Sequence, residues 1–555
     1  MRENKRILKY ILDKVSSLNQ FNLIELNKLK PTIGIRSMGT FSGHEVCLNS
    51  SELNSHVEDV STDISQESGV NEGSSLQHNG NTIVFKKSDN ELNITTFKNI
   101  VSKTICKNIE SLDFSNLKES KNFLKINTDF FIKEFHLFNN QIIVLGSNER
   151  DVEYDYKKVQ LKEYLKKYNN NNNFINIYKI TKKNKIKLKS STSIEGYIET
   201  TRIINGKLFF FNQFTPYLTK EIDYSKDKKE TIVNEFLIPK LNNNFISTKD
   251  KNILIESHSN SIKINSLFSI NLKNYKLKYK SIISDSINDI YFNNDFALFT
   301  NIYNSKTRIF NFKISKKLSY KKSLHIEGTP LNKFAFSEFN GVLRVATSIG
   351  GFFNTTSKNY LFTIDISKNK ILDSISDFGK PGETIQGIRF YKNIAYIVTF
   401  EKTDPLYTFD LINPNNIKYL GELEIPGYSI LFHQIYDDRI ISVGKNANEN
   451  GLETGVLVQL FDCSNLNNVK LLDKLKYGKS WSTSTNAFKD QKNLLFRKSD
   501  NLLGLEIFDN TSFFNFNNDN NNSFFNLIKI ENDNLIQLKT YNLEYSNYKT
   551  LLLTF

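Results

Sequence analysis

Cysteine, proline and tryptophan are scarce in this chain of 555 residues, which holds three Cys, eight Pro and one Trp. The cysteines, Cys47, Cys106 and Cys463, are odd in number and far apart, and none belongs to a Cys-x-x-Cys pair. This excludes a disulfide framework and a cysteine-based zinc or redox site. No apolar run approaches the roughly 18 residues that suggest a transmembrane helix, so none is expected.

The hydrophobic and aromatic content is high enough for a large core built from strands. Hydrophobic residues make up 39% of the chain against 24% charged, which excludes wholesale disorder. The aromatic share is carried by 44 Phe and 25 Tyr. Because aromatic residues favour strands, the composition predicts an all-β protein.

The net charge of +14 raises the question of an anionic partner. The lysines are interleaved with Asn, Ile, Phe, Tyr and acidic residues along the whole chain, as in Lys162-Glu163-Tyr164 and residues 182–185. This distribution favours solvated strand faces and lysines that guard sheet edges, and nucleic-acid binding would need one continuous basic face. We therefore do not expect a nucleic-acid partner, although an anionic one stays open.

The N-terminal part is predicted to be a helix and a linker. Ile7, Leu8, Ile11, Leu12, Val15 and Leu18 follow helical spacing, so an amphipathic helix is expected within residues 1–28, packed on its own domain. Residues 29–78 show no sustained periodicity and are predicted to be a polar linker, with the globular part at 79–555. No apolar core of a signal peptide is visible at the N-terminus.

A repeated hairpin pattern organises the rest of the chain. A few alternating residues lead to a polar turn, and a dense strand of β-branched and aromatic residues follows. The second residue of each turn marks eight copies: Gly80, Asn140, Gly206, Asn294, Gly341, Asn393, Asp438 and Lys492. Further apolar strands follow several copies, which predicts four-stranded blades of a β-propeller.

Eight blades are expected, with seven as the alternative. The interval between Gly206 and Asn294 is long enough for an insertion, in which residues 250–256 suggest an extra hairpin. The C-terminal residues 548–555 are a plausible strand that closes the ring by completing a blade begun by the first strands. Crossover helices of a parallel α/β fold do not fit between the strands, while two β-sandwich domains are a weaker alternative.

Motifs in the second half resemble those of a known family. They lie at Phe336-Ser-Glu-Phe-Asn-Gly-Val-Leu-Arg-Val-Ala-Thr, Gly382-Glu-Thr-Ile-Gln-Gly-Ile-Arg-Phe, Ala395-Tyr-Ile-Val-Thr-Phe, Thr403-Asp-Pro-Leu-Tyr-Thr-Phe-Asp-Leu, Leu420-Gly-Glu-Leu-Glu-Ile-Pro-Gly-Tyr-Ser and Leu460-Phe-Asp. The stretch resembles the bacterial and archaeal family of secreted proteins with a C-terminal β-propeller domain, distantly related to WD40 repeats. Weaker matches extend upstream through Gly196-Tyr-Ile-Glu-Thr-Thr-Arg to residues 61–72.

The resemblance implies a propeller of a family that is typically exported and whose biochemical role is not established. The chain departs from the family after Gly69-Val70, where Asn71-Glu72-Gly73-Ser74 keeps one carboxylate of the family's three. Within Ile425-Pro-Gly-Tyr, Gly427 is expected to take a positive φ at a crossing between blades.

No local motif indicates a reaction or a cofactor. The seven histidines show no metal-site spacing, and neither a G-x-S-x-G elbow nor a phosphate-binding glycine loop occurs, so no metal or cofactor is expected. Asp437-Asp438 is interpreted as a hairpin turn rather than as a catalytic pair. No catalytic residue is assigned, although a propeller can assemble a site from separate blades.

Register within the repeat suggests a ligand-binding site at the channel mouth. Four residues before each marker, where the inner strand is predicted to begin, several copies carry a polar residue. The resulting candidates are His136, Arg202, Arg389 and Gln434, with His433 beside them. They could converge on one anionic ligand, or each arginine could pair with an acidic residue of the neighbouring blade.

We expect a monomeric, non-enzymatic binding or interaction scaffold whose partner is a protein or an anionic small molecule or polymer. The alternative is an enzyme with a composite active site at the channel mouth. Groups with strongly shifted pKa values in a deep pocket would favour the enzyme, and an exposed apolar rim would favour the scaffold.

Overall fold

The computed structural model describes most of the chain between residues 59 and 554. The described residues are 10–11, 59–60, 62–63, 71–72, 76–79, 82–96, 111–113, 124–148, 172–181, 183, 185–216, 237–247, 253–255, 263–315, 317–350, 357–376, 378–400, 404–425, 427–447, 452–488, 491–498, 500–509, 522–543 and 550–554.

Eight antiparallel units of four strands each follow one another along the described chain. The first four blades are β4 (Leu76–His78), β5 (Thr82–Ser88), β6 (Glu91–Thr96) and β8 (Leu124–Asn127); β9 (Phe131–Phe138), β10 (Gln141–Ser147), β11 (Asn172–Ile180) and β12 (Ile186–Glu195); β13 (Tyr197–Ile204), β14 (Lys207–Phe214), β18 (Lys263–Asn271) and β19 (Leu277–Ser284); and β20 (Ile290–Phe292), β21 (Phe296–Tyr303), β22 (Lys306–Lys313) and β23 (Ser319–Glu327).

The last four blades have the same order. They are β24 (Phe336–Phe339), β25 (Val342–Ile349), β26 (Lys358–Asp365) and β27 (Lys370–Ser376); β28 (Thr384–Tyr391), β29 (Ile394–Phe400), β30 (Asp404–Asp410) and β31 (Lys418–Ile425); β32 (Tyr428–Tyr436), β33 (Arg439–Ala447), β34 (Glu453–Asp462) and β35 (Lys470–Tyr477); and β37 (Leu494–Arg497), β38 (Leu502–Asp509), β39 (Asn522–Glu531) and β40 (Asn534–Leu543).

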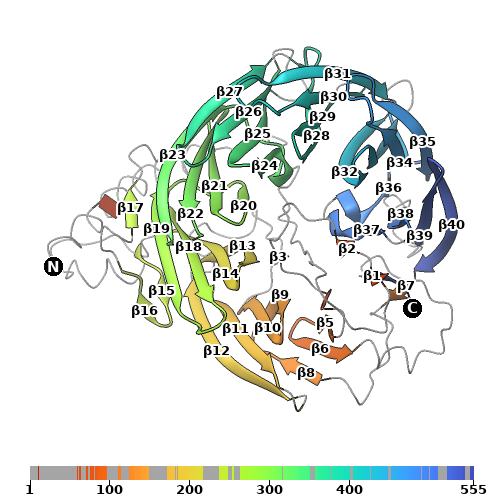
Figure 1. Ribbon diagram of the computed structural model, residues 1–555. Helices are drawn as coiled ribbons and strands as arrows, with labels where there is room; N and C mark the ends of the chain where they lie inside the picture. The colour runs from red at the N-terminus through yellow and green to blue at the C-terminus, as the bar shows by residue number, and fades with distance from the viewer. Residues whose placement is uncertain are drawn as a thin grey trace, which may run out of the picture.

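The eight units surround a common centre, so the described fold is an eight-bladed β-propeller (Figure 1). The first strand of each blade lies innermost and the fourth lies at the rim. The predicted all-β propeller is confirmed, and the count of eight follows from the described sheets. Short 3-10 turns, η1 (Lys333–Ala335), η2 (Asn486–Phe488) and η3 (Gln491–Asn493), precede the fifth and eighth blades.

The predicted hairpin turns depend on residues that tolerate a left-handed backbone. Asn139, Asn205, Asn340 and Lys392 all have φ between 46° and 54° in the turn between the first and second strands of their blades. The marker Lys492 was wrong: it lies in η3, and the turn of the eighth blade comes later, between Arg497 and Leu502.

Apolar side chains of neighbouring blades form the core. The second and third strands of each blade are largely buried, as in β21, where Phe299 stacks on Phe310 of β22 with ring centroids 4.4 Å apart. One buried cluster joins residues of the fourth, fifth and sixth blades, and another joins the seventh and eighth. The core is therefore shared between blades.

Additional strands extend the second, third and eighth blades. β15 (Lys240–Leu241) and β16 (Asn244–Phe245) add to β12, β17 (Ile253–Ile255) adds to β19, and β36 (Thr483–Ser484) pairs with β38. Of the hairpin predicted at residues 250–256, only Ile253–Ile255 lie among the described residues, where they form β17 and pair in parallel with β19. Ile11 of the predicted N-terminal helix is fully buried against this insertion, in a cluster with Leu237 and Ile253.

Four short strands lie within the segment 29–78 that the sequence analysis assigned to a linker. β4 is the first strand of the first blade, while β2 (Thr62–Asp63) pairs with β37 and β3 (Asn71–Glu72) pairs with β13. β1 (Asp59–Val60) and β7 (Ser111–Asp113) flank the C-terminal β41 (Thr550–Thr554) in a separate sheet. We expected the last strand to complete a blade begun by the first strands. This expectation is wrong, because β41 pairs with β1 and β7 instead.

Buried polar side chains fix four successive connections between blades. From the third strand of the preceding blade, Asn173 donates to the Gly196 carbonyl at 2.6 Å, Asn265 to Asp285 at 2.7 Å, Thr307 to Gly328 at 2.6 Å and Asn359 to Phe378 at 2.9 Å. From the second strand of the following blade, Asn212 donates to the Glu195 carbonyl, Asn301 to Asp285 and Thr347 to Glu327, while Thr399 donates to the Glu383 carboxylate. Each connection is therefore held from both sides.

We predict that Asn265→Ala destabilises the propeller. Asn265 is fully buried, and its removal takes one of the three side-chain donors from the Asp285 carbonyl and leaves a cavity. The loss of a buried hydrogen bond typically costs about 1–3 kcal/mol when one partner is left unsatisfied. Chemical denaturation measures the effect, with the exposed Asn542→Ala as the control. Equal unfolding midpoints for the two variants would contradict the assigned role.

We predict that Gly427→Val impairs folding for two separable reasons. Gly427 has a φ of +82°, as expected, and an added Cβ would lie 2.5 Å from the Lys445 carbonyl oxygen. Positive φ alone costs about 1–3 kcal/mol. Gly206 has a φ of +68° and open space around it, so Gly206→Val carries the backbone cost without the clash. Gly427→Val should therefore show the larger fall in unfolding midpoint, and a fall no larger than that of Gly206→Val would refute the steric part.

Candidate functional site

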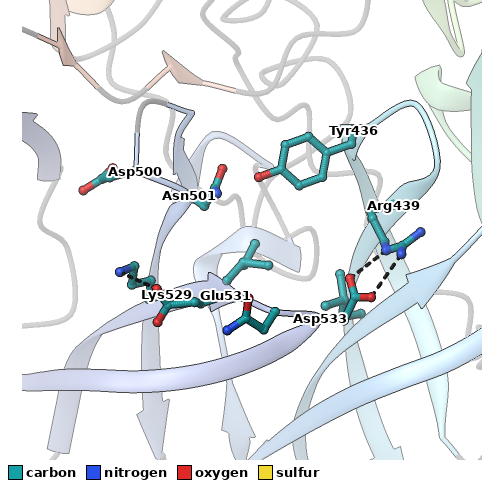
Figure 2. Close-up of a pocket in the computed structure, with 10 residues that line it drawn as sticks. Tyr436, Arg439, Asp500, Asn501, Lys529, Glu531 and Asp533 are labelled. Atoms are coloured by element: carbon teal, nitrogen blue, oxygen red, sulfur yellow. Dashed lines mark hydrogen bonds and ion pairs between the residues drawn. The ribbon is translucent and has the colours of Figure 1, made fainter.

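An open cavity of about 530 Å³ lies between the seventh and eighth blades. The seventh blade contributes the end of β32, the start of β33 and Leu460 of β34. The eighth blade contributes the turn before β38 and the turn between β39 and β40. Figure 2 shows the side chains of Tyr436, Asp500, Glu531 and Asp533 arranged around this space.

The cavity exists because the pattern that closes the preceding blade junctions changes here. In the fourth, fifth and sixth blades, a polar side chain of the third strand donates to a carbonyl in a turn of the next blade: Asn311 to Ile366 at 2.8 Å, Thr363 to Pro414 at 2.6 Å and Thr408 to Leu466 at 2.7 Å. Leu460 takes this position in the seventh blade, two residues before Asp462 as Thr408 is two before Asp410. Leucine cannot donate, so this junction has no such bond.

The facing turn of the eighth blade is also short. Only Asn532 and Asp533 separate β39 from β40, whereas the corresponding turns of the sixth and seventh blades span residues 411–417 and 463–469. Both turn residues have positive φ, 51° and 61°, which a tight two-residue turn requires. The missing length leaves Leu460 at the floor of an open space.

Arg439 joins the two blades at one side of the cavity. Its guanidinium binds Asp533 through two bonds, Nε to Oδ1 at 2.8 Å and Nη2 to Oδ2 at 3.0 Å. Nη1 binds Asp462 Oδ1 at 2.8 Å and Asp438 Oδ2 at 3.0 Å. All three guanidinium nitrogens are therefore engaged by carboxylates.

Two further ion pairs complete the charged wall. Arg497 donates to both carboxylate oxygens of Asp500, at 2.9 and 2.7 Å. Lys529 lies 3.2 Å from Glu531 on β39. Tyr436 supplies a partly exposed aromatic ring, and Gln434 donates to the Tyr436 carbonyl.

The resolved pKa shifts in this cavity point away from neutrality. The hydrogen bonds with Asp533 hold the pKa of Arg439 above its ordinary value, and the same bonds hold the pKa of Asp533 below its ordinary value. Hydrogen bonds from Ser464, followed by the charge of Arg439, lower the pKa of Asp462. These three groups keep fixed charges near pH 7, which suits binding rather than proton transfer.

The candidates predicted from register lie in two groups on facing sides of the ring. His136 and Arg202 belong to the second and third blades, and Arg389, His433 and Gln434 belong to the sixth and seventh (Figure 1). Each lies on an innermost strand, but near its end and not at its start as the sequence analysis expected. The register could not tell which blades face one another.

In the first group, contacts run between adjacent blades. His136 Nε2 lies 2.7 Å from Thr201 Oγ1, and Thr201 donates to Glu134. Arg202 is buried, donates to the Thr201 carbonyl at 2.8 Å and lies 5.9 Å from the centroid of Phe292 in the fourth blade. β3 pairs with the inner edge of its strand, with Glu72 opposite Arg202 in the register.

In the second group, Arg389 and His433 each pack against an aromatic ring. Arg389 lies 5.3 Å from the ring centroid of Phe334, and His433 packs edge-on against Phe496 at 5.4 Å. Burial, followed by the charge of Arg389, lowers the pKa of His433 to about 3. Gln434 is the member that connects to the cavity, through the Tyr436 carbonyl.

Sequence reasoning missed the residues that form the cavity, including Arg439, Asp500 and Asp533. Asp437-Asp438 was identified correctly as a turn, but its contacts were not: Asp437 binds Lys392 at 2.9 Å, and Asp438 binds Arg439. A detectable signal was the short polar stretch Glu531-Asn-Asp-Asn534, compared with the longer turns of the blades before it.

Two acidic groups near the innermost strands have pKa values shifted toward neutrality. Burial raises the pKa of Glu199 to about 7, against the charges of Lys133 and Lys263. Burial also raises the pKa of Asp289 to about 7, against a hydrogen bond from Thr300. Lys133 and Glu199 are the extra residues of β-bulges in β9 and β13, which re-aim side chains within an innermost strand.

Neither a cluster of metal ligands nor a membrane-spanning helix occurs in the described part of the chain. No group of three or more His, Cys, Asp or Glu residues there could hold a metal ion. None of the helices described is long and apolar enough to cross a membrane.

A family model described as the beta propeller domain matches residues 60–551. The chain belongs to this beta propeller domain family. The match begins within the segment taken for a linker, in agreement with the short strands found there. An uncharacterised protein of Methanocaldococcus jannaschii is 43% identical over 171 residues, which are 30% of this chain and 26% of that protein. An uncharacterised protein of Archaeoglobus fulgidus is 35% identical over 177 residues, 32% of this chain and 26% of the relative.

The propeller thus matches about a quarter of the length of each of these curated relatives. Solved structures with a similar arrangement include a hypothetical selenium-binding protein of Sulfolobus tokodaii, with a TM-score of 0.32, 11% identity and coverage of 53% of this chain and 78% of that one. Another is the β-propeller domain of the Trilobed protease of Pyrococcus furiosus, with a TM-score of 0.22, 11% identity and coverage of 62% and 97%. Similarity at this level carries no functional argument.

We predict that Glu199 and Asp289 make the propeller less stable as pH rises. In the unfolded chain these carboxyls titrate near pH 4, so between about pH 4 and pH 7 the folded state binds more protons than the unfolded state. The free energy of unfolding should therefore fall as pH rises through this window.

The double variant Glu199→Gln with Asp289→Asn should remove this component. Buried His78 and His433 act in the opposite direction, because their lowered pKa values make the folded state bind fewer protons below pH 6.5. The measurement is therefore the difference in melting temperature between variant and wild type from pH 5 to pH 8, with the exposed Glu422→Gln as the control. A difference that does not change with pH would contradict the shifted pKa values.

Proposed function

We propose that this propeller is a non-enzymatic binding scaffold, and that the cavity between its seventh and eighth blades receives a polar segment of a protein partner. The observation that carries the proposal is the open, charge-lined cavity at a junction where the pattern of the preceding blades is interrupted. A cavity with convergent polar groups and an aromatic wall is the usual form of a ligand site.

The fixed charges of the cavity favour binding over catalysis. A general acid or base works best with a pKa near the working pH, whereas Arg439, Asp462 and Asp533 are shifted away from it. Glu199 and Asp289 have suitable pKa values and are the observation that favours the enzymatic alternative. Neither group lines the cavity between the seventh and eighth blades, which counts against a catalytic role for them at this site.

Selection from a random peptide library on the immobilised propeller tests the scaffold function. Recovered peptides should lose affinity about fivefold or more for Tyr436→Ala, because truncation of a central aromatic contact typically costs at least about 1 kcal/mol. Tyr303→Ala is a matched control, since Tyr303 is an exposed tyrosine in the fourth blade. Failure to recover peptides, or peptides that bind Tyr436→Ala as tightly as wild type, would refute the proposal.

A further inference from the structure

We propose that the cavity is selective for an organic cation, the guanidinium or ammonium group of a basic side chain on the partner. This inference rests on the proposed scaffold function and specifies the chemistry of its ligand. It follows from which charged atoms are accessible, which donors are already used, and where the aromatic ring lies.

The accessible charges are mainly carboxylates, while the two arginines that pair with them are less exposed. The side chains of Asp438, Asp533, Glu531 and Asp500 are 51%, 50%, 49% and 44% exposed, against 18% for Arg439 and 3% for Arg497. A ligand that enters the cavity therefore meets carboxylate oxygens first. The arginines lie behind them and hold them in place.

Arg439 and Arg497 offer little to an anionic ligand. Arg439 already donates to three carboxylates, and Arg497 donates to both oxygens of Asp500. An anion would have to displace one of these bonds and would meet the exposed carboxylates on its way. The remaining cation, Lys529, is itself paired with Glu531.

Local charge in the cavity is opposite in sign to the charge of the whole chain. Three carboxylates line the cavity, Asp500, Glu531 and Asp533, against two cations, Arg439 and Lys529. The chain as a whole carries +14. A cationic peptide is therefore repelled by the average surface, so binding of such a peptide must come from a local acidic site.

Tyr436 supplies the second element that a cation needs. Its ring lies at the same cavity as Asp500, Glu531 and Asp533 (Figure 2). The face of an aromatic ring attracts ammonium and guanidinium groups, and guanidinium also matches carboxylates through paired hydrogen bonds. A basic side chain flanked by the ring and the carboxylates would satisfy both preferences.

The test measures binding of fluorescent tetra-arginine and tetra-glutamate peptides to the full chain. Tetra-arginine should bind at low ionic strength and weaken as salt is added. Tyr436→Leu and Glu531→Gln should each weaken it about two- to fivefold, as expected for an exposed cation contact of about 0.5–1 kcal/mol. Neither change removes a partner of Arg439 or Arg497. Glu422→Gln, on the rim strand β31, is the control and should leave the affinity unchanged.

The outcomes separate the ligand class from the scaffold function. Tetra-glutamate binding that depends on Tyr436 would overturn selectivity for a cation and leave the scaffold intact. Tetra-arginine binding that ignores both cavity variants, or no binding of either peptide, would also overturn the cation inference. In these last cases, the peptide selection with Tyr436→Ala decides whether the scaffold function is correct.

Discussion

Buried hydrogen bonds at the connections between blades are the constraint on which the rest of the ring depends. Apolar packing between blades is favourable but not directional, so it alone leaves their relative angle poorly defined. Asn265 and Asn301 donate from neighbouring blades to the same Asp285 carbonyl. At the next connection, Thr307 and Thr347 donate to the successive carbonyls of Gly328 and Glu327. Because an unpaired buried carbonyl is costly, a blade cannot slide without losing these bonds.

Ion pairs between exposed turns also link neighbouring blades. The desolvation cost of these charged groups is smaller than it would be in the core. Lys392 of the sixth blade binds Asp437 of the seventh, and Arg439 of the seventh binds Asp533 of the eighth. Exposed pairs of this kind are individually weak. Arg439 differs because one guanidinium engages three carboxylates, two in separate turns and one at the end of β34, so it fixes one side of the cavity and also links two blades.

The repeat was predictable from sequence because turn chemistry is local. Asn205-Gly206 and Asn340-Gly341 take the positive φ values that a two-residue hairpin turn needs, so they identify a blade without knowledge of any other blade. The eighth blade was misplaced because its turn, residues 498–501, is longer than those of the other copies, which allowed Lys492 to be taken as the marker. The pairing of Asn71-Glu72 with β13 was not predictable, since so short a strand has no periodicity to detect.

The cavity was beyond sequence reasoning for a different physical reason. Arg439 and Asp533 are 94 residues apart, and packing of the seventh blade against the eighth brings them together. A repeat predicts which positions of the blades are equivalent, but the cavity lies where equivalent positions differ. Leu460 stands where Thr363 and Thr408 supply a hydrogen-bond donor, and the opposing turn has only two residues. Occurring together at one junction, these two differences leave space that the charged turns surround, and the specificity of the cavity follows from which of those charges remain exposed.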